Sequence, residues 1–179
     1  MTQAANTYAQ ALYDLAKDEG MGKLLLEELA VLKKVFVETP QYSKLLSTPD
    51  IPKQERCGIL DEAFRGKVHP YVLNFLKILT EKGYPRHFSD CCAAYRNRYN
   101  QDHDILPVRA VTAVALTESQ SARLCEKLQT ITGKTIELTN RVEPGVLGGV
   151  RLDYDGKQLD DTVSHRLENI RNLLNTTVL

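Results

Sequence analysis

Features that mark several common classes of protein are missing from this 179-residue sequence. No apolar run approaches the roughly 18 residues that a membrane-spanning helix needs. The first six residues, Met1 to Asn6, have neither a charged region nor an apolar core, so they do not form a signal peptide. We therefore expect the protein to stay on the side of the membrane where it is made.

An excess of one charge is also missing. The chain has 23 basic and 23 acidic side chains, and by count residues 1–104 carry 14 of each and residues 105–179 carry 9 of each. Proteins that bind nucleic acids take much of their affinity from neutralising phosphates with lysine and arginine. Because neither half is basic, we expect no nucleic-acid partner.

The common nucleotide-binding motifs are absent as well. There is neither a phosphate loop nor a dinucleotide fingerprint. The one glycine-rich segment, Gly145 to Gly149, precedes a predicted strand and not the N-terminus of a helix, where backbone N–H groups would cradle a phosphate. We expect no nucleotide and no other cofactor.

The four cysteines, Cys57, Cys91, Cys92 and Cys125, lack the spacing of a metal site or a disulfide framework. In a reducing compartment they should be free thiols. His87 and Cys91 share a helical face, but a metal site needs three or four converging ligands, so a half-buried histidine beside a core thiol is the better interpretation. The alternative functions are a thiol-dependent enzyme that uses Cys91 or Cys92, and a soluble adaptor protein.

Residues 1–104 predict an all-α bundle of six short helices, because apolar residues recur at three- and four-residue steps. The helices are separated by glycine and proline residues, at Gly20, Pro40, Pro52, Gly66 and Pro85. The fifth helix, from His69-Pro70 to Lys82, has an apolar arc wider than the single stripe of a surface helix. This arc comprises Val72, Leu73, Phe75, Leu76, Ile78 and Leu79. Such an arc is expected of a central helix, or of a helix that offers one face to a partner helix.

Residues 105–179 predict a small α/β domain. Ile105 to Leu116 reads as a long strand. Its apolar face would hold Leu106, Val108, Ala110, Val114 and Leu116. Thr117 and Gln120 have the spacing of a capping box, at the start of a helix that ends at Gly133. A second strand is expected from Thr135 to Arg141.

The segment from Glu143 to Arg166 carries the most informative pattern. Gly148-Gly149, at the start of a strand, permits the close approach of another backbone, or a bulge. The alternating strand that follows ends at Asp155-Gly156, a two-residue hairpin signal. Asp160 to Thr162 is expected to begin the last helix, where negative charge is favourable. These carboxylates are therefore interpreted as turn and helix-start residues and not as a calcium site.

This ordered pattern resembles the C-terminal signature of the delta subunit of bacterial F-type ATP synthase, the counterpart of the mitochondrial oligomycin-sensitivity-conferring protein. The signature is a Gly-Gly pair, an alternating strand, a glycine-containing turn, and then Asp-Gly-Ser and a helix with Arg-Leu. The matching residues here are Gly148, Gly149, Gly156, Asp160, Arg166 and Leu167. Asp161-Thr162 stands where the family has Gly-Ser, so the entry to the helix is expected to differ in detail.

Three further motifs of the family occur in the same order. Tyr8-Ala9-x-Ala11-Leu12 is similar to the opening of its first helix, and Leu45 to Ile51 is similar to its Leu-Leu-x-x-Pro-x-Ile segment. Asn74 to Gly83 resembles the Asn-Phe-Leu motif of its fifth helix, although Tyr84 stands where the family usually has arginine. The resemblance therefore extends over the whole chain.

The resemblance implies a six-helix domain, residues 1–104, that binds the catalytic head, and an α/β domain, residues 105–179, that contacts the peripheral stalk. The implied protein is a structural subunit and not an enzyme. It links the α3β3 head to stalk subunit b and resists the torque of the rotor during ATP synthesis. The implied partners are the N-terminal helices of the α subunits, subunit b and, as a further candidate, the β subunit. The implied location is the cytoplasmic side of the cell inner membrane, held only through the complex.

In the family, one α-subunit helix lies in a groove between the first and fifth helices. By resemblance, the groove residues are expected to be Tyr8, Ala11, Leu12, Asn74, Ile78 and Lys82. Tyr8 and Ala11 would line one wall, and Asn74 and Ile78 the other, unless these residues are plain bundle core. For subunit b, the nearest candidates are exposed residues around Arg151, Arg166 and the last helix.

Overall fold

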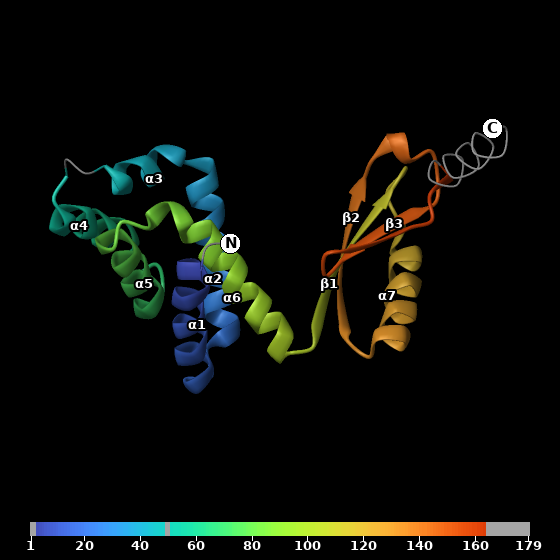
Figure 1. Cartoon of the computed structure of the whole chain (residues 1–179), viewed down its shortest axis with the longest axis horizontal. Helices are drawn as coiled ribbons and strands as arrows, with labels where there is room; N and C mark the ends of the chain where they lie inside the picture. The colour runs from blue at the N-terminus through green and yellow to red at the C-terminus, as the bar shows by residue number, and fades with distance from the viewer. Residues whose placement is uncertain (1–2, 49–50, 164–179) are drawn as a thin grey trace, which may run out of the picture. The chain divides into compact units, whose positions relative to one another are not determined.

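A computed structural model of the chain describes residues 3–48 and 51–163 (Figure 1). The chain divides into two compact units, Met1–Tyr99 and Asn100–Leu179. The first unit is helical, and the second combines a helix with a four-stranded sheet. The prediction of a helical N-terminal region followed by an α/β region is therefore confirmed.

Helices alone build the first unit, and the last of them continues to Asp102, three residues into the second unit. In chain order they are α1 (Gln3–Asp18), α2 (Gly22–Glu38), α3 (Pro40–Ser47), α4 (Lys53–Phe64), α5 (Pro70–Glu81), the 3-10 turn η1 (Pro85–His87) and α6 (Phe88–Asp102). The predicted start of the last of these helices at Pro85 was wrong by one turn. The N–H of His87 donates to the carbonyl of Tyr84, which is a three-residue step, so Pro85 opens a 3-10 turn and α6 begins at Phe88.

One hydrophobic core joins the helices of this unit. The alanines of α1 that face it, Ala5, Ala9 and Ala16, are at most 1% exposed, and their small side chains let α1 approach its neighbours closely. The core also holds the buried apolar side chains of α5, namely Val72, Leu73, Phe75, Leu76 and Leu79. Burial thus accounts for most of the wide apolar arc of α5, and Ile78 is the exposed member of that arc at 43%.

The second unit is a mixed sheet with a helix on one face. Its elements are β1 (Ile105–Thr112), α7 (Glu118–Thr132), β2 (Thr135–Val142), the 3-10 turn η2 (Pro144–Val146), β3 (Val150–Tyr154) and β4 (Lys157–Asp160). The strand order is β2-β1-β3-β4, with β1 parallel to β2 and antiparallel to β3. Parallel neighbours need a crossover, which α7 supplies. Its Leu124 and Leu128 pack against a core of Val108, Ala110 and Leu152.

Local signals in the sequence set both ends of α7. The hydroxyl of Thr117 accepts a hydrogen bond from the N–H of Gln120, and the Gln120 side chain accepts one from the N–H of Thr117. These two bonds form the predicted capping box. Gly133 ends the helix in the left-handed conformation, with φ of 67°.

The first strand is shorter than predicted. It ends at Thr112, where the threonine hydroxyl donates to the carbonyl of Val114 at 2.7 Å and the chain bends. Beyond the bend, the N–H of Leu116 donates to the side-chain oxygen of Asn140 on β2 at 3.0 Å. Val114, which the alternating pattern places on the inner face, is instead 75% exposed.

The β3–β4 hairpin turns at Asp155 and Gly156, where φ is 46° and 71°, as the Asp-Gly signal predicts. Asp160 differs from expectation, because it is the last residue of β4 and not the first of a helix. Its side chain nevertheless serves the next turn, since it accepts a hydrogen bond from the N–H of Thr162 at 3.0 Å. No helix within residues 3–48 and 51–163 has the length and apolar character of a membrane span.

Candidate partner-binding surfaces

The α1 residues of the predicted groove lie at different depths. Tyr8 is half-buried and Ala11, one turn further on, is exposed. Leu12 is only 6% exposed and belongs to the core, so its side chain supports this surface from beneath. Leu15 extends the exposed face of α1 by one turn, with 42% of its surface open to solvent. Its four-residue step from Ala11 is the signal that could have added it to the prediction.

The α5 residues of the predicted groove lie on one exposed face. Asn74 and Ile78 are four residues apart, and both are exposed. Lys82 follows the last turn of α5 and is also exposed. The N–H of Tyr84 donates to the carbonyl of Leu79 at 2.8 Å, and this bond folds the chain back at the end of α5.

One aromatic contact brings the two groups together. The ring of Tyr8 on α1 lies 6.4 Å, centroid to centroid, from the ring of Tyr84, which follows α5. The exposed part of α1 therefore lies beside the C-terminal end of α5. Tyr84 stands where the resemblance leads one to expect arginine, and only the folded chain shows that it contacts Tyr8.

Three residues of the C-terminal signature meet at a second place, which we call the C-terminal clasp. It consists of residues 148–150 at the start of β3 and residues 160–163 after β4. The N–H of Asp161 donates to the carbonyl of Val150 at 3.2 Å, and the N–H of Val163 donates to the carbonyl of Gly148 at 3.0 Å. A Cβ atom on Gly149 would lie 2.5 Å from the carbonyl oxygen of Asp161. The Gly-Gly pair is therefore the site of close backbone approach that the sequence predicts.

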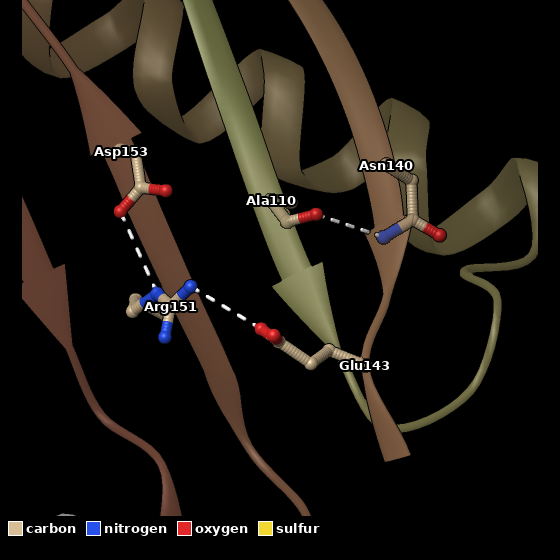
Figure 2. A network of polar contacts seen from close by, with 5 residues as sticks. All are labelled: Ala110, Asn140, Glu143, Arg151 and Asp153. Atoms are coloured by element: carbon tan, nitrogen blue, oxygen red, sulfur yellow. Dashed lines mark hydrogen bonds and ion pairs between the residues drawn. The ribbon is translucent and has the colours of Figure 1, made fainter. Parts of the chain in front are cut away.

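Next to the clasp, β3 carries a small polar network (Figure 2). A guanidinium nitrogen of Arg151 lies 3.3 Å from a carboxylate oxygen of Glu143, and its Nε lies 3.6 Å from Asp153. Asn140 on β2 donates to the carbonyl of Ala110 on β1 at 3.0 Å (Figure 2). Arg166 and Leu167, the other predicted residues of the signature, lie outside the described residues.

The thiols of Cys91 and Cys92 have the wrong chemistry for nucleophiles. Burial raises the pKa of Cys91 to about 11, with a further contribution from Asp90, and burial raises the pKa of Cys92 to about 12. A thiolate is the reactive form, so both thiols are protonated and unreactive near neutral pH. His87, the last residue of η1, lies 3.6 Å from the carboxylate of Asp90 in the first turn of α6. In the described ranges, no three His, Cys, Asp or Glu residues converge as metal ligands would.

Comparison with known proteins gives consistent matches over the whole chain. The family described as "ATP synthase delta (OSCP) subunit" matches residues 4–174. The chain is 32% identical over 167 residues to the "ATP synthase subunit delta" of Alkaliphilus oremlandii, covering 93% of each protein. It is 33% identical over 178 residues to the protein of the same name from Lactobacillus delbrueckii subsp. bulgaricus, covering 96% of each.

A solved structure has the same fold. It is a chain in the cryo-EM structure of the Toxoplasma gondii mitochondrial ATP synthase hexamer, with a TM-score of 0.75 and 17% sequence identity. The match covers 97% of this chain and 98% of that chain.

Proposed function

Because the chain belongs to the ATP synthase delta (OSCP) subunit family, we propose that its two units bind two different parts of that complex. The protein is a non-catalytic stator subunit of the F-type ATP synthase, and it takes part in ATP synthesis by holding the complex against rotation. It belongs to a membrane-associated assembly. The two binding contacts, their partners and the side of the membrane are our proposal.

The first contact is made by a six-helix domain, residues 1–104, that binds an N-terminal helix of an α subunit. The observation that carries this proposal is the contact of Tyr8 on α1 with Tyr84, which follows α5, together with the exposed apolar side chains that both helices carry. Ile78 is 43% exposed, although its neighbour Leu79 is 1% exposed, and Leu15 on α1 is 42% exposed. An amphipathic helix binds by laying apolar residues at three- and four-residue steps on such a surface. Ala11 offers room for close approach between the larger side chains.

The second contact is made by the α/β domain, residues 105–179, which binds the C-terminal end of stalk subunit b. The β subunit is a further candidate neighbour of the head-binding domain. Together the two contacts join the α3β3 head to the peripheral stalk on the cytoplasmic side of the inner membrane. Torque from the rotor loads this link in every cycle, so each contact must dissociate slowly. Nanomolar binding, for comparison, corresponds to about 12 kcal/mol.

The first contact can be tested by calorimetry, in which a synthetic N-terminal segment of the α subunit is titrated into the full-length chain. We expect saturable one-to-one binding with a negative change in heat capacity, which marks the burial of apolar surface. Ile78→Asp should abolish this binding, because a carboxylate in a docking groove loses solvation without gaining a partner. Its fold should be retained, since Ile78 is already half in solvent.

Val31→Asp is the matched control. Val31 is 61% exposed on α2, outside the predicted groove, so the same chemical change there should leave α binding intact. Loss of binding in both variants would show a general effect of charge, and normal binding in Ile78→Asp would place the α contact elsewhere. A thermal melt separates these results from unfolding of the variant.

A further inference from the structure

We propose that the C-terminal clasp is a joint that transmits load between the start of β3 and the end of β4, with Gly149 as its positioning residue. This inference rests on the proposed contact of the second unit with the stalk.

The clasp continues the β3–β4 hairpin beyond its last regular pair. Arg151 pairs with Asp160 in the ladder. The bonds from Asp161 to Val150 and from Val163 to Gly148 then continue with the same register. This register places Thr162 opposite Gly149, and a Cβ on Gly149 would lie 2.9 Å from the Cα of Thr162. The crossing is therefore a direct backbone-to-backbone contact.

Glycine at position 149 meets two separate requirements of this contact. Its φ is +83°, a conformation that costs a residue with a side chain about 1 kcal/mol or more. A Cβ would also lie 2.5 Å from the Asp161 carbonyl, and a backbone atom cannot swing aside as the end of a flexible side chain can. Any other residue must push the two segments apart.

The arrangement suits a joint under load. Hydrogen bonds in an antiparallel ladder run perpendicular to the strands, so a pull along the strand acts on both clasp bonds together. Thr162 is only 3% exposed between these bonds, and the Asp160 side chain accepts the hydrogen bond of its N–H. The side chain of Val163 lies against Gly148, 3.5 Å from the place of its missing Cβ. Residues 160–163 are thus held against the start of β3 by backbone and side-chain contacts.

Gly149→Ala tests the joint, with Gly156→Ala as its matched control. Gly156 also has positive φ, +71°, in the same unit, but nothing lies within 4 Å of the place of its Cβ. Both full-length variants would be titrated with two probes: the recombinant soluble portion of stalk subunit b, and the synthetic N-terminal α segment. We expect Gly149→Ala to weaken binding of b at least about tenfold, equivalent to about 1.4 kcal/mol. Its α binding should be unchanged, and Gly156→Ala should retain both affinities.

A second pair of variants keeps the test decisive if Gly149→Ala does not fold. Val163 is helical, and proline is compatible with the first turn of a helix. Val163→Pro removes the N–H that bonds to Gly148, whereas Val163→Ala removes side-chain atoms and keeps that N–H. Only the proline variant should lose affinity for b. Hydrogen exchange at Asp161 should quicken in it, while exchange in β1 stays slow.

The outcomes separate this inference from the proposed function. If the wild-type chain binds the α segment but not b, the stalk contact fails and the inference fails with it. If wild type binds b, and Gly149→Ala and Val163→Pro bind it equally well despite faster exchange at Asp161, the stalk contact stands and the clasp is overturned as its positioning element. Equal weakening by both alanine variants at glycine would also overturn it, because backbone strain alone would then explain the loss.

Discussion

The hydroxyl of Tyr95, on α6, donates a hydrogen bond of 3.1 Å to the carbonyl of Gly22, the first residue of α2. The tyrosine is fully buried, and its ring meets the ring of Tyr13 edge to face, with centroids 5.3 Å apart. This hydrogen bond thus fixes the position of α6 relative to the start of α2.

Tyr95→Phe should lower the free energy of unfolding by about 1 kcal/mol, the usual net value of one hydrogen bond. The ring and its aromatic contact with Tyr13 remain, so the fold and α binding should be unchanged. Urea denaturation followed by circular dichroism measures the difference. Equal stability of Tyr95→Phe and wild type would mean that water replaces the lost donor.

Asn140→Asp should destabilise the second unit by about 1 kcal/mol, the usual net value of one hydrogen bond, because Asn140 is itself exposed. The Asn140 amide donates to the carbonyl of Ala110 and to the hydroxyl of Thr112, at 3.0 and 2.9 Å. A carboxylate of the same shape offers an acceptor to the Ala110 carbonyl and loses that bond. Denaturation at neutral pH measures the loss.

The pH dependence of this variant gives a second reading. The Ala110 carbonyl disfavours the anionic form of the new carboxyl, so the pKa of this carboxyl should be higher in the folded than in the unfolded protein. The destabilisation should therefore shrink as the pH falls toward the folded pKa. A loss that is the same at acid and neutral pH would mean that the charge does not matter. Asn140→Ala, which retains neither role, separates lost bonds from added repulsion.

Thr117→Ala should reduce the stability of the second unit by about 1 kcal/mol, because it removes the N-cap of α7. Thr130→Ala, in the same helix, is the control. The Thr130 hydroxyl donates to the carbonyl of Glu126, one turn earlier, and alanine is the better helix former. The control should therefore be neutral or slightly stabilising. Similar losses in both variants would point to helix propensity and not to the cap.

Stability should fall as the pH rises above about 9. Burial raises the pKa of Cys91 to about 11 and of Cys92 to about 12 from an ordinary value of 9.0. Groups with raised folded pKa values hold protons that the unfolded chain releases, so their contribution is full below the unfolded pKa and is lost through the folded pKa. Denaturation curves at pH 8, 9 and 10 would show the decline.

The double variant Cys91→Ala/Cys92→Ala should show a flatter decline over this interval, although its stability at pH 8 is lower because of the smaller side chains. Parallel declines in wild type and the double variant would assign the alkaline sensitivity to other groups. Tyr95 is one such group, because burial also raises its pKa from 10.0.

Signals confined to a few residues predicted their structures well. The capping box at Thr117 and Gln120, the hairpin turn at Asp155-Gly156 and the helix end at Gly133 all formed as their residue types require. Each depends on bonds between neighbours in the chain, which exist whatever the rest of the fold does. The family resemblance, for the same reason, could be read from ordered short motifs.

Patterns whose outcome depends on distant residues were less informative. The alternation from Ile105 to Leu116 continues past the true end of β1, because a bend held by Asn140, 24 residues beyond Leu116, interrupts it. Ile78 and Leu79 are equally apolar neighbours on α5, yet one is exposed and the other buried. Leu12 shares a motif with Tyr8 and Ala11 but lies in the core.

The amino-acid sequence by itself determined the order of the elements, their caps and turns, and the family to which the chain belongs, since all of these follow from short-range chemistry. Tertiary structure alone decided which face of α5 stays in solvent and which ring Tyr8 meets. It also decided that Gly149 passes against Asp161, 12 residues later, because only the paired β3 and β4 strands bring those backbones together. Such contacts depend on how elements pack, and no local pattern encodes the partner.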